Sequence, residues 1–191
     1  MKKKTLLSVI AAATLAVTIF AGCGKKEDTA KTNTDTPTKT EDKTDAVTTA
    51  SIVNDADAFV KAASKEGTWI IATLGDLKVD KEINLEGEFK NGKKDDKGND
   101  VIQRKIGLYT QDADHNVTAR FILTAPKLTV TSPNARIQSG TFKGDVYVSV
   151  DNFQLVDAKI DGNLYFTTDT AKSTFKMDDK SSVTGVQELK K

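Results

Sequence analysis

The chain is poor in the residues that most often carry chemistry. Among its 191 residues are one cysteine, one histidine, one tryptophan and only three arginines. A single cysteine excludes an intramolecular disulfide and any cysteine-rich metal site. Catalytic sites of the Ser-His-Asp or Cys-His type need a histidine beside the nucleophile, so a chain with one histidine can form at most one of them. With a formal net charge of +1 and no basic patch, the sequence argues against a nucleic-acid partner.

The chain also has no apolar run long enough to cross a bilayer. Its longest, residues 6–20, falls short of the roughly 20 residues that a spanning helix needs. Three lysines at residues 2–4 precede this run and small residues follow it. That layout is typical of a secretory signal peptide, which we assign to residues 1–22.

The end of this signal, FAGC at residues 20–23, resembles the lipobox of bacterial lipoproteins, although Phe20 stands where leucine is usual. The resemblance implies that Cys23 receives a diacylglycerol on its sulfur and becomes the mature N-terminus. Buried acyl methylenes contribute roughly 0.8 kcal/mol each. We therefore expect a lipid-anchored protein on the extracytoplasmic face of the cell membrane, and the shortage of arginine relative to lysine favours a Gram-positive host.

The lipidated N-terminus and a polar segment occupy residues 23–50. Residues 24–50 contain nine threonines, interleaved charges of both signs and no aromatic residue. Such a composition buries too little apolar surface to offset the entropy of ordering, which predicts a disordered tether of roughly 30 Å. The folded domain is then expected at residues 51–191.

One helix is expected at the start of this domain, at about residues 55–66. Asn54 or Asp55 is its predicted N-cap, and Gly67 its predicted C-terminal stop. Apolar residues recur at helical spacing on one face: Ala56, Phe59, Val60 and Ala63.

Beyond Gly67 the apolar residues alternate with polar ones, as in half-buried strands, and no second amphipathic helix is expected. Residues 105–123 resemble two strands joined by a polar turn at 112–116, which predicts an antiparallel hairpin. The predicted inward residues are Leu77, Val79, Ile83, Leu85, Ile106, Leu108, Ala119, Phe121, Leu123, Leu128, Val130, Val146 and Val148.

The sequence repeats itself after 18 residues. FKGDVYV at residues 142–148 is followed by IDGNLYF at 160–166, and a partial third copy lies at 183–186, delayed by five residues. Extended backwards, the same register places Leu128 and Val130 one repeat before Val146 and Val148. Repetition at this period predicts an all-β fold of the β-solenoid type, with about five or six turns of roughly 20 residues.

Two resemblances to known families accompany this repeat. The helix and the sequence GTWIIATLGDLKVDKEINLEGEF, within residues 51–89, resemble the N-terminal cap and first coils of right-handed parallel β-helices of the pectate-lyase type. The repeats at 128–186 resemble the coils of bactofilins, a polymer-forming cytoskeletal family. Together they imply a right-handed parallel β-helix, and the first implies that a helix caps its N-terminal end. A β-sandwich or barrel, which the hairpin at 105–123 favours, remains the alternative.

The most informative surface residues are two tyrosines. If Val146 and Val148 point inward, Tyr147 points outward, and Tyr165 lies beside it one repeat later. Stacked exposed tyrosines make a flat platform for sugar rings or another protein; the other interpretation is a cross-strand pair that only stabilises the fold. Lys143 and Asp161 are expected as a structural pair in the same register.

The sequence contains no complete motif for a metal site or a catalytic site. Residues 112–116 have the D-x-D-x-N spacing of a calcium loop, but Val117 replaces the tight-turn glycine and Leu123 the bidentate glutamate. His115 belongs to the same polar turn, and the acidic stretch at 95–100 has the composition of a solvated loop. We therefore expect no catalytic residue, metal or cofactor.

Two functions from different classes remain open. The first is a non-enzymatic binding or adhesion module, which presents one face to cell-wall polysaccharide or a surface protein. The second is a bactofilin-like assembly protein, in which solenoids meet end to end. The five residues QELKK after Val186 are too few to cap the last turn well, so a dimer through the C-terminal end is open to either.

Overall fold

The computed structural model describes residues 50–190, which are mostly β-strand with two short helices. The predicted signal peptide, Cys23 and the predicted tether up to residue 49 lie outside the described residues. The all-β class is confirmed. The first strand starts at Ala50, one residue before the expected start of the domain.

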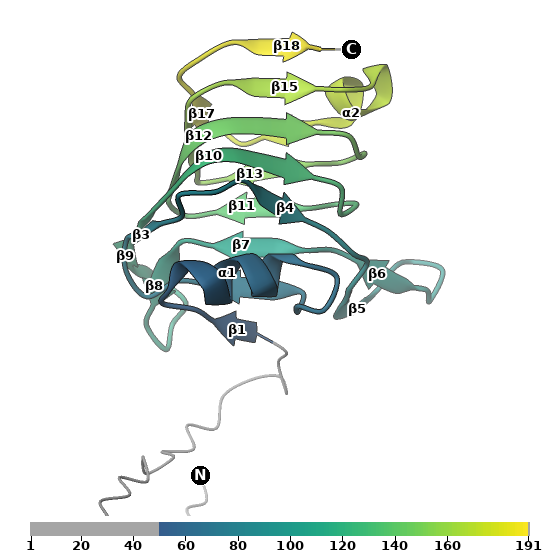
Figure 1. The fold of residues 1–191 in the computed structure, drawn as a ribbon. Helices are drawn as coiled ribbons and strands as arrows, with labels where there is room; N and C mark the ends of the chain where they lie inside the picture. The colour runs from purple at the N-terminus through teal and green to yellow at the C-terminus, as the bar shows by residue number, and fades with distance from the viewer. Residues whose placement is uncertain (1–49, 191) are drawn as a thin grey trace, which may run out of the picture. The chain divides into compact units, whose positions relative to one another are not determined.

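The first sheet has six strands, and all of its neighbours are parallel (Figure 1). In spatial order they are β1 (Ala50–Ile52), β2 (Ile70–Ala72), β7 (Lys105–Gly107), β11 (Arg136–Gln138), β13 (Gln154–Val156) and β16 (Lys176–Met177).

The second sheet has eight strands and is also parallel throughout. Its two long strands each pair with two short ones on one side: β10 with β3 and β4, and β12 with β14 and β15. The strands are β3 (Leu77–Lys78), β4 (Ile83–Leu85), β10 (Ile122–Val130), β12 (Thr141–Val148), β14 (Lys159–Asp161), β15 (Leu164–Phe166), β17 (Ser182–Val183) and β18 (Gln187–Leu189).

The strand register agrees with the sequence repeat. Leu128, Val146 and Leu164 are consecutive Cα partners across β10, β12 and β15, and each is 18 positions from the next. The delayed third copy also pairs as expected, because Val183 lies opposite Ile160. From β2 onwards the chain alternates between the two sheets, so each passage through the second sheet pairs with the passage before it.

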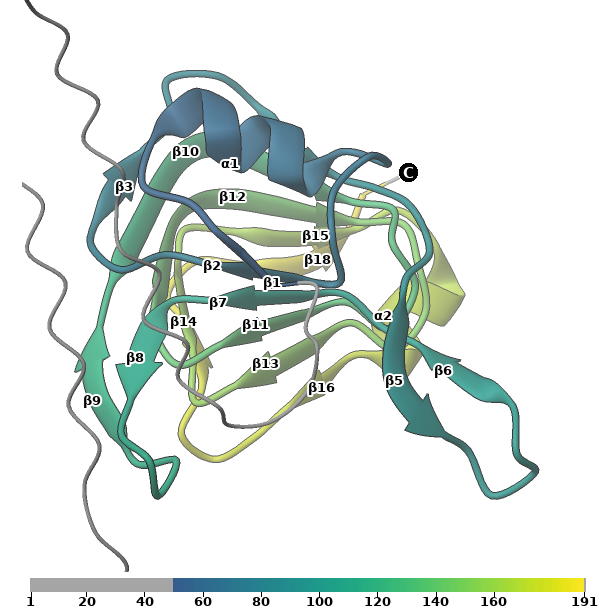
Figure 2. The same ribbon diagram turned by 90° about the horizontal axis from the view of Figure 1, so that it is seen from below.

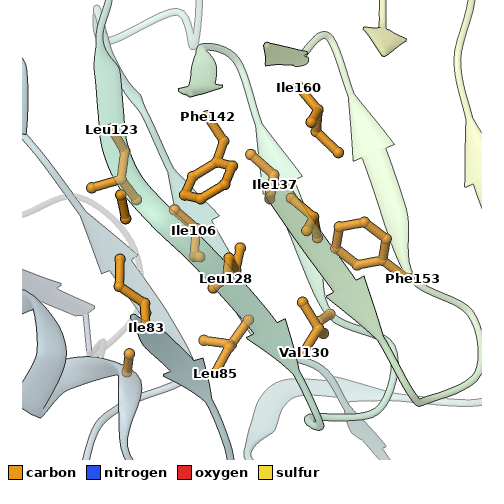
Figure 3. Close-up of a cluster of buried hydrophobic side chains, with 14 of the residues drawn as sticks. Ile83, Leu85, Ile106, Leu123, Leu128, Val130, Ile137, Phe142, Phe153 and Ile160 are labelled. Carbon is orange, nitrogen blue, oxygen red and sulfur yellow. The ribbon is translucent and has the colours of Figure 1, made fainter. Parts of the chain in front are cut away.

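The space between the two sheets holds the hydrophobic core (Figure 3). Most of the predicted inward residues are fully buried there, which confirms the alternation. Three are only half-buried: Leu77, Ala119 and Phe121. Ala119 lies in a hairpin that projects from the sheets, and Phe121 follows that hairpin directly, so neither reaches the core.

Helix α1 (Ala56–Ala63) lies beside β4, at the N-terminal edge of the second sheet (Figure 1). Asp55, one of the two residues predicted for this position, is its N-cap, and its Oδ1 accepts a hydrogen bond of 2.8 Å from the backbone N–H of Ala58. The helix buries Phe59, while Val60 is half-buried against the core. Its predicted end at residue 66 was three residues too late.

Gly67 does not act as the helix C-cap that the sequence predicted. The helix ends with Ser64 in an extended conformation, and Gly67 does not adopt a positive φ. A side chain at Gly67 would instead overlap the carbonyl of Ala62 and the guanidinium of Arg104. Glycine is thus required there for close packing rather than for a left-handed helix cap.

Two antiparallel hairpins extend from the parallel sheets (Figure 2). One joins β8 (Tyr109–Gln111) to β9 (Val117–Arg120) and confirms the expected hairpin. The other joins β5 (Lys90–Lys94) to β6 (Asp100–Ile102) and was not expected, since a solvated loop was predicted at 95–100. In Figure 2 both hairpins project on the side of the first sheet that faces away from the second.

A short second helix and a last strand complete the described chain. The helix α2 (Asp169–Thr174), capped by Thr168, was missed because its six residues bury only Ala171. Neither described helix is long and apolar enough to span a membrane. Gln187–Leu189 forms β18 beside β15, so three of the five residues after Val186 add a strand to the second sheet. Within the described residues, β18 pairs with β15 alone.

Candidate functional site

The second sheet brings the two predicted tyrosines together. Tyr147 on β12 and Tyr165 on β15 are Cα partners, and both are half-buried on the outer face. Their ring centroids are 4.8 Å apart, with a tilt of 41° between the ring planes. The adjacency follows the predicted register. The tilt differs from the flat platform expected, so a ligand would meet two inclined ring faces.

Two lysines that the sequence did not single out complete the tyrosine site, which we define as Tyr147, Tyr165, Lys127 and Lys190. Nζ of Lys127 lies 5.1 Å from the ring centroid of Tyr147, and Nζ of Lys190 lies 4.4 Å from that of Tyr165. Lys190 also donates to the hydroxyl of Tyr147 at 3.3 Å. That hydrogen bond raises the pKa of Lys190.

The signal for Lys127 was present in the repeat. Lys127 is the Cα partner of Asp145, which lies two positions before Tyr147 on β12. Lys127 is therefore on the same outer face as Tyr147. No comparable signal marks Lys190, because it lies just beyond β18, outside the repeat. The tyrosine site thus presents two aromatic faces, two hydroxyls and two ammonium groups on one surface. Lys127 is also paired with Glu82 at 3.1 Å, and Lys190 with the Tyr147 hydroxyl. This combination of aromatic and polar groups suits a hydroxyl-rich ligand.

Polar pairs on the same face are structural. Oδ1 of Asp145 accepts from the backbone N–H and the side-chain amide of Asn163 at 3.0 and 2.9 Å. Lys143 and Asp161 are Cα partners, as predicted. Asp161, however, forms its ion pair with Lys159 at 3.5 Å. The register predicted for Lys143 and Asp161 is therefore correct, but the ion pair of Asp161 is with a different lysine.

The two hairpin turns share one hydrogen-bond pattern, in which an aspartate at the start of the turn accepts hydrogen bonds from an asparagine four residues later. Oδ1 of Asp112 accepts from the backbone N–H of Asn116 at 2.8 Å, and Asp95 does the same with Asn99. These hydrogen bonds, first of all those from the asparagine side chains, lower the pKa of both aspartates. His115 is left-handed with φ 64°, as a turn of this kind requires. Across residues 50–190, no group of three or more acidic, histidine or cysteine side chains is arranged to hold a metal ion.

Comparison with known proteins gives this chain no relative. No protein family, no curated protein and no solved structure matches it. The resemblances to pectate-lyase-type helices and to bactofilins therefore stay predictions.

Proposed function

We propose that this chain is a lipid-anchored, extracytoplasmic binding module without catalytic activity, and that its tyrosine site takes cell-wall polysaccharide. The observation that carries the proposal is the pairing of Tyr147 with Tyr165, with ring centroids 4.8 Å apart. Aromatic faces pack against the apolar faces of sugar rings, while hydroxyl and ammonium groups bind sugar hydroxyls. A protein partner is the other ligand that this surface would fit.

We also propose that the fold is a right-handed β-solenoid and not a β-sandwich. It is supported by the alternation of the chain between two sheets and by their parallel register. Glycines support it as well: side chains at Gly144 and Gly162 would overlap the carbonyls of Ala125 and Gly144, one repeat earlier. Such close stacking of turns is expected of a solenoid.

The test is co-sedimentation of the purified full chain, in mild detergent, with isolated peptidoglycan sacculi. We expect the native chain to pellet with the sacculi and the double variant Tyr147→Ala/Tyr165→Ala to stay in the supernatant. Tyr147→Phe/Tyr165→Phe is the matched control, because it keeps both rings and should retain most of the binding. Circular dichroism must show the same β-sheet spectrum for all three proteins. Undiminished binding by the alanine variant would refute a role for the tyrosines.

A second candidate function, assembly in the manner of bactofilins, rests on the last strands. Within the described residues, β16 pairs only with β13, and β17 only with β14. Met177 and Val186 are 43% and 44% exposed at this end. Unpaired strand edges with exposed apolar side chains favour association. Light scattering of the full chain over a range of concentrations decides: a constant monomer mass excludes assembly, and growth with concentration supports it.

A further inference from the structure

The outer face of the first sheet carries a row of three cations and one glutamine on neighbouring strands. Lys105, Arg136, Gln154 and Lys176 are consecutive Cα partners across β7, β11, β13 and β16. Lys105 and Arg136 are thus directly opposite each other with like charges. Such a pair destabilises a sheet, so a structural role alone does not account for it.

Lys105 lies among aromatic rings rather than beside a carboxylate. Its Nζ is 5.7 Å from the ring centroid of Trp69 and 5.8 Å from that of Tyr109, and it donates to the Tyr109 hydroxyl at 3.4 Å. The Tyr109 ring covers Gly107, where a methyl group would lie 3.4 Å from its Cε1. The aromatic and cationic groups are therefore next to one another on one face.

Arg136 has a free donor beside this lysine. Its Nε and Nη2 both donate to Oε1 of Gln154, at 3.0 and 2.6 Å. Within residues 50–190, Nη1 of Arg136 makes no hydrogen bond, and neither Arg136 nor Lys105 forms an ion pair. Burial, and then the charges of Arg136 and Lys93, lower the pKa of Lys105. An anion placed here would compensate several positive charges at once.

The two hairpins stand on either side of this surface. Both project beyond the outer face of the first sheet, one from each end of its strands (Figure 2). Tyr109 belongs to β8 of one hairpin, and Lys93 belongs to β5 of the other. The hairpins thus extend the cationic and aromatic surface at both ends.

We propose that Trp69, Lys105, Tyr109 and Arg136, together the basic face, form a second binding site, for an anionic polysaccharide. Carboxylate or phosphate groups of the polymer bind the free donors of Lys105 and Arg136, and a sugar ring packs against Tyr109 or Trp69. This site lies on the opposite sheet from the tyrosine site and does not depend on it.

A polymer fits better than a small anion because the cations form a line. Neighbouring strands are about 4.8 Å apart, so the row from Lys105 to Lys176 extends over roughly 14 Å. The row runs perpendicular to the strands and matches a chain with repeated charges. Half-buried aromatic groups beside the cations favour a sugar polymer over one without rings.

The test measures binding of the full chain, in mild detergent, to immobilised alginate, phosphomannan and neutral dextran. We expect binding to alginate or phosphomannan and none to dextran; the tighter of the two identifies carboxylate or phosphate as the group bound. Lys105→Gln/Arg136→Gln should weaken binding by about tenfold or more, as expected for lost charge-assisted hydrogen bonds. Lys143→Gln/Lys159→Gln is the control, because it removes the same charge from the second sheet.

Three outcomes would overturn the proposal. An equal loss in the control variant would mean that binding follows net charge alone. Equal binding to dextran would remove the role of the anion. Tighter binding of a single-stranded oligonucleotide than of either polysaccharide would point to nucleic acid instead.

Two further readouts separate a binding role from a structural one. Lys105→Gln should melt at the same temperature as the native chain or higher, because it removes a like-charge pair; a clear decrease would show that Lys105 stabilises the fold and would refute the proposal. In the native chain, an NMR titration should show the pKa of Lys105 rising when the polysaccharide is added. An unchanged pKa in the saturated protein would mean that the anion binds elsewhere.

Discussion

Arg104 holds the C-terminal end of helix α1 through Ala63, the last residue of that helix. Nη1 of Arg104 donates to the carbonyl oxygen of Ala63 at 2.8 Å, and also to that of Ser64 at 2.8 Å. The side chain is fully buried, and its guanidinium lies 4.2 Å from the ring centroid of Phe89. The positive charge complements the helix dipole and satisfies carbonyls that a helix end leaves without donors.

Replacement of Arg104 by methionine should therefore be strongly destabilising. Arg104→Met leaves several buried carbonyls without donors, and we expect the free energy of unfolding to fall by about 3 kcal/mol. Urea denaturation of the full chain measures the change. Arg120→Met is the control: Arg120 pairs with Asp157 on the surface, and its loss should cost less than about 1 kcal/mol. Equal losses would show that burial of Arg104 contributes nothing specific.

The glycines between successive repeats give a second prediction. Gly144 has φ 141°, and a side chain there would overlap the carbonyl of Ala125; one at Gly162 would overlap the carbonyl of Gly144. We expect Gly144→Ala and Gly162→Ala each to lower the melting temperature by several degrees, since backbone atoms must move apart. Gly75→Ala should have little effect, because nothing lies within 4 Å of the added methyl group. Unchanged melting of both repeat variants would contradict the close stacking.

The unexpected β5–β6 hairpin gives a prediction about pH. Hydrogen-bonded ion pairs with Lys90 at 2.7 Å and Lys94 at 2.5 Å lower the pKa of Asp100 to about 2. This pKa is below the ordinary aspartate value of about 3.9. The pairs therefore stabilise the hairpin above about pH 4, and this contribution is lost as the pH falls towards 2.

A carboxyl-carbon NMR titration checks this value directly. We expect Asp100 to titrate near pH 2 in the native chain and near the ordinary aspartate value in Lys90→Gln/Lys94→Gln. High salt should move the native value in the same direction, because all three side chains reach solvent. A native midpoint close to 4 would mean that the ion pairs do not form in solution.

The predicted lipid anchor is tested in the cell rather than in the fold. Cys23→Ser removes the thiol that the lipobox resemblance identifies as the acylation site. In the producing bacterium we expect the native chain in the membrane fraction, labelled by radioactive palmitate, and the variant unlabelled. Tyr165→Ala, processed in parallel, should be labelled like the native chain. Labelling of Cys23→Ser would disprove the assigned anchor.

Much of the parallel architecture could be predicted because the repeat is local and regular. The interval of 18 residues indicates which side chains face the core, and it predicts Tyr147 beside Tyr165, as the register confirms. Asp55 could be recognised as the N-cap because capping depends on only three residues of sequence. The β5–β6 hairpin could not, since β5 is polar on both sides and neither strand shows an alternation of apolar and polar residues.

The roles of Arg104 and Lys105 could not be predicted, for another reason. Arg104 and Lys105 are neighbours in the sequence, yet one is buried against α1 and the other lies on the outer face of the first sheet. The partner of Arg104 is 41 positions away, and that of Lys105 is on the next strand of its sheet. No short-range pattern records such contacts. Gly67 was assigned to the helix end for the same reason, although the group it must accommodate is Arg104.

The regular pairing of β12 with the strands before and after it makes the length of the domain adjustable. Residues 141–158 contain one complete passage through both sheets, with their own inward and outward rows. Each passage contacts mainly its two neighbours, so a duplicated copy of these residues would meet the same surfaces above and below. Lineages could lengthen or shorten such a domain by whole units, and thereby change the area of its two outer faces, without redesigning the core.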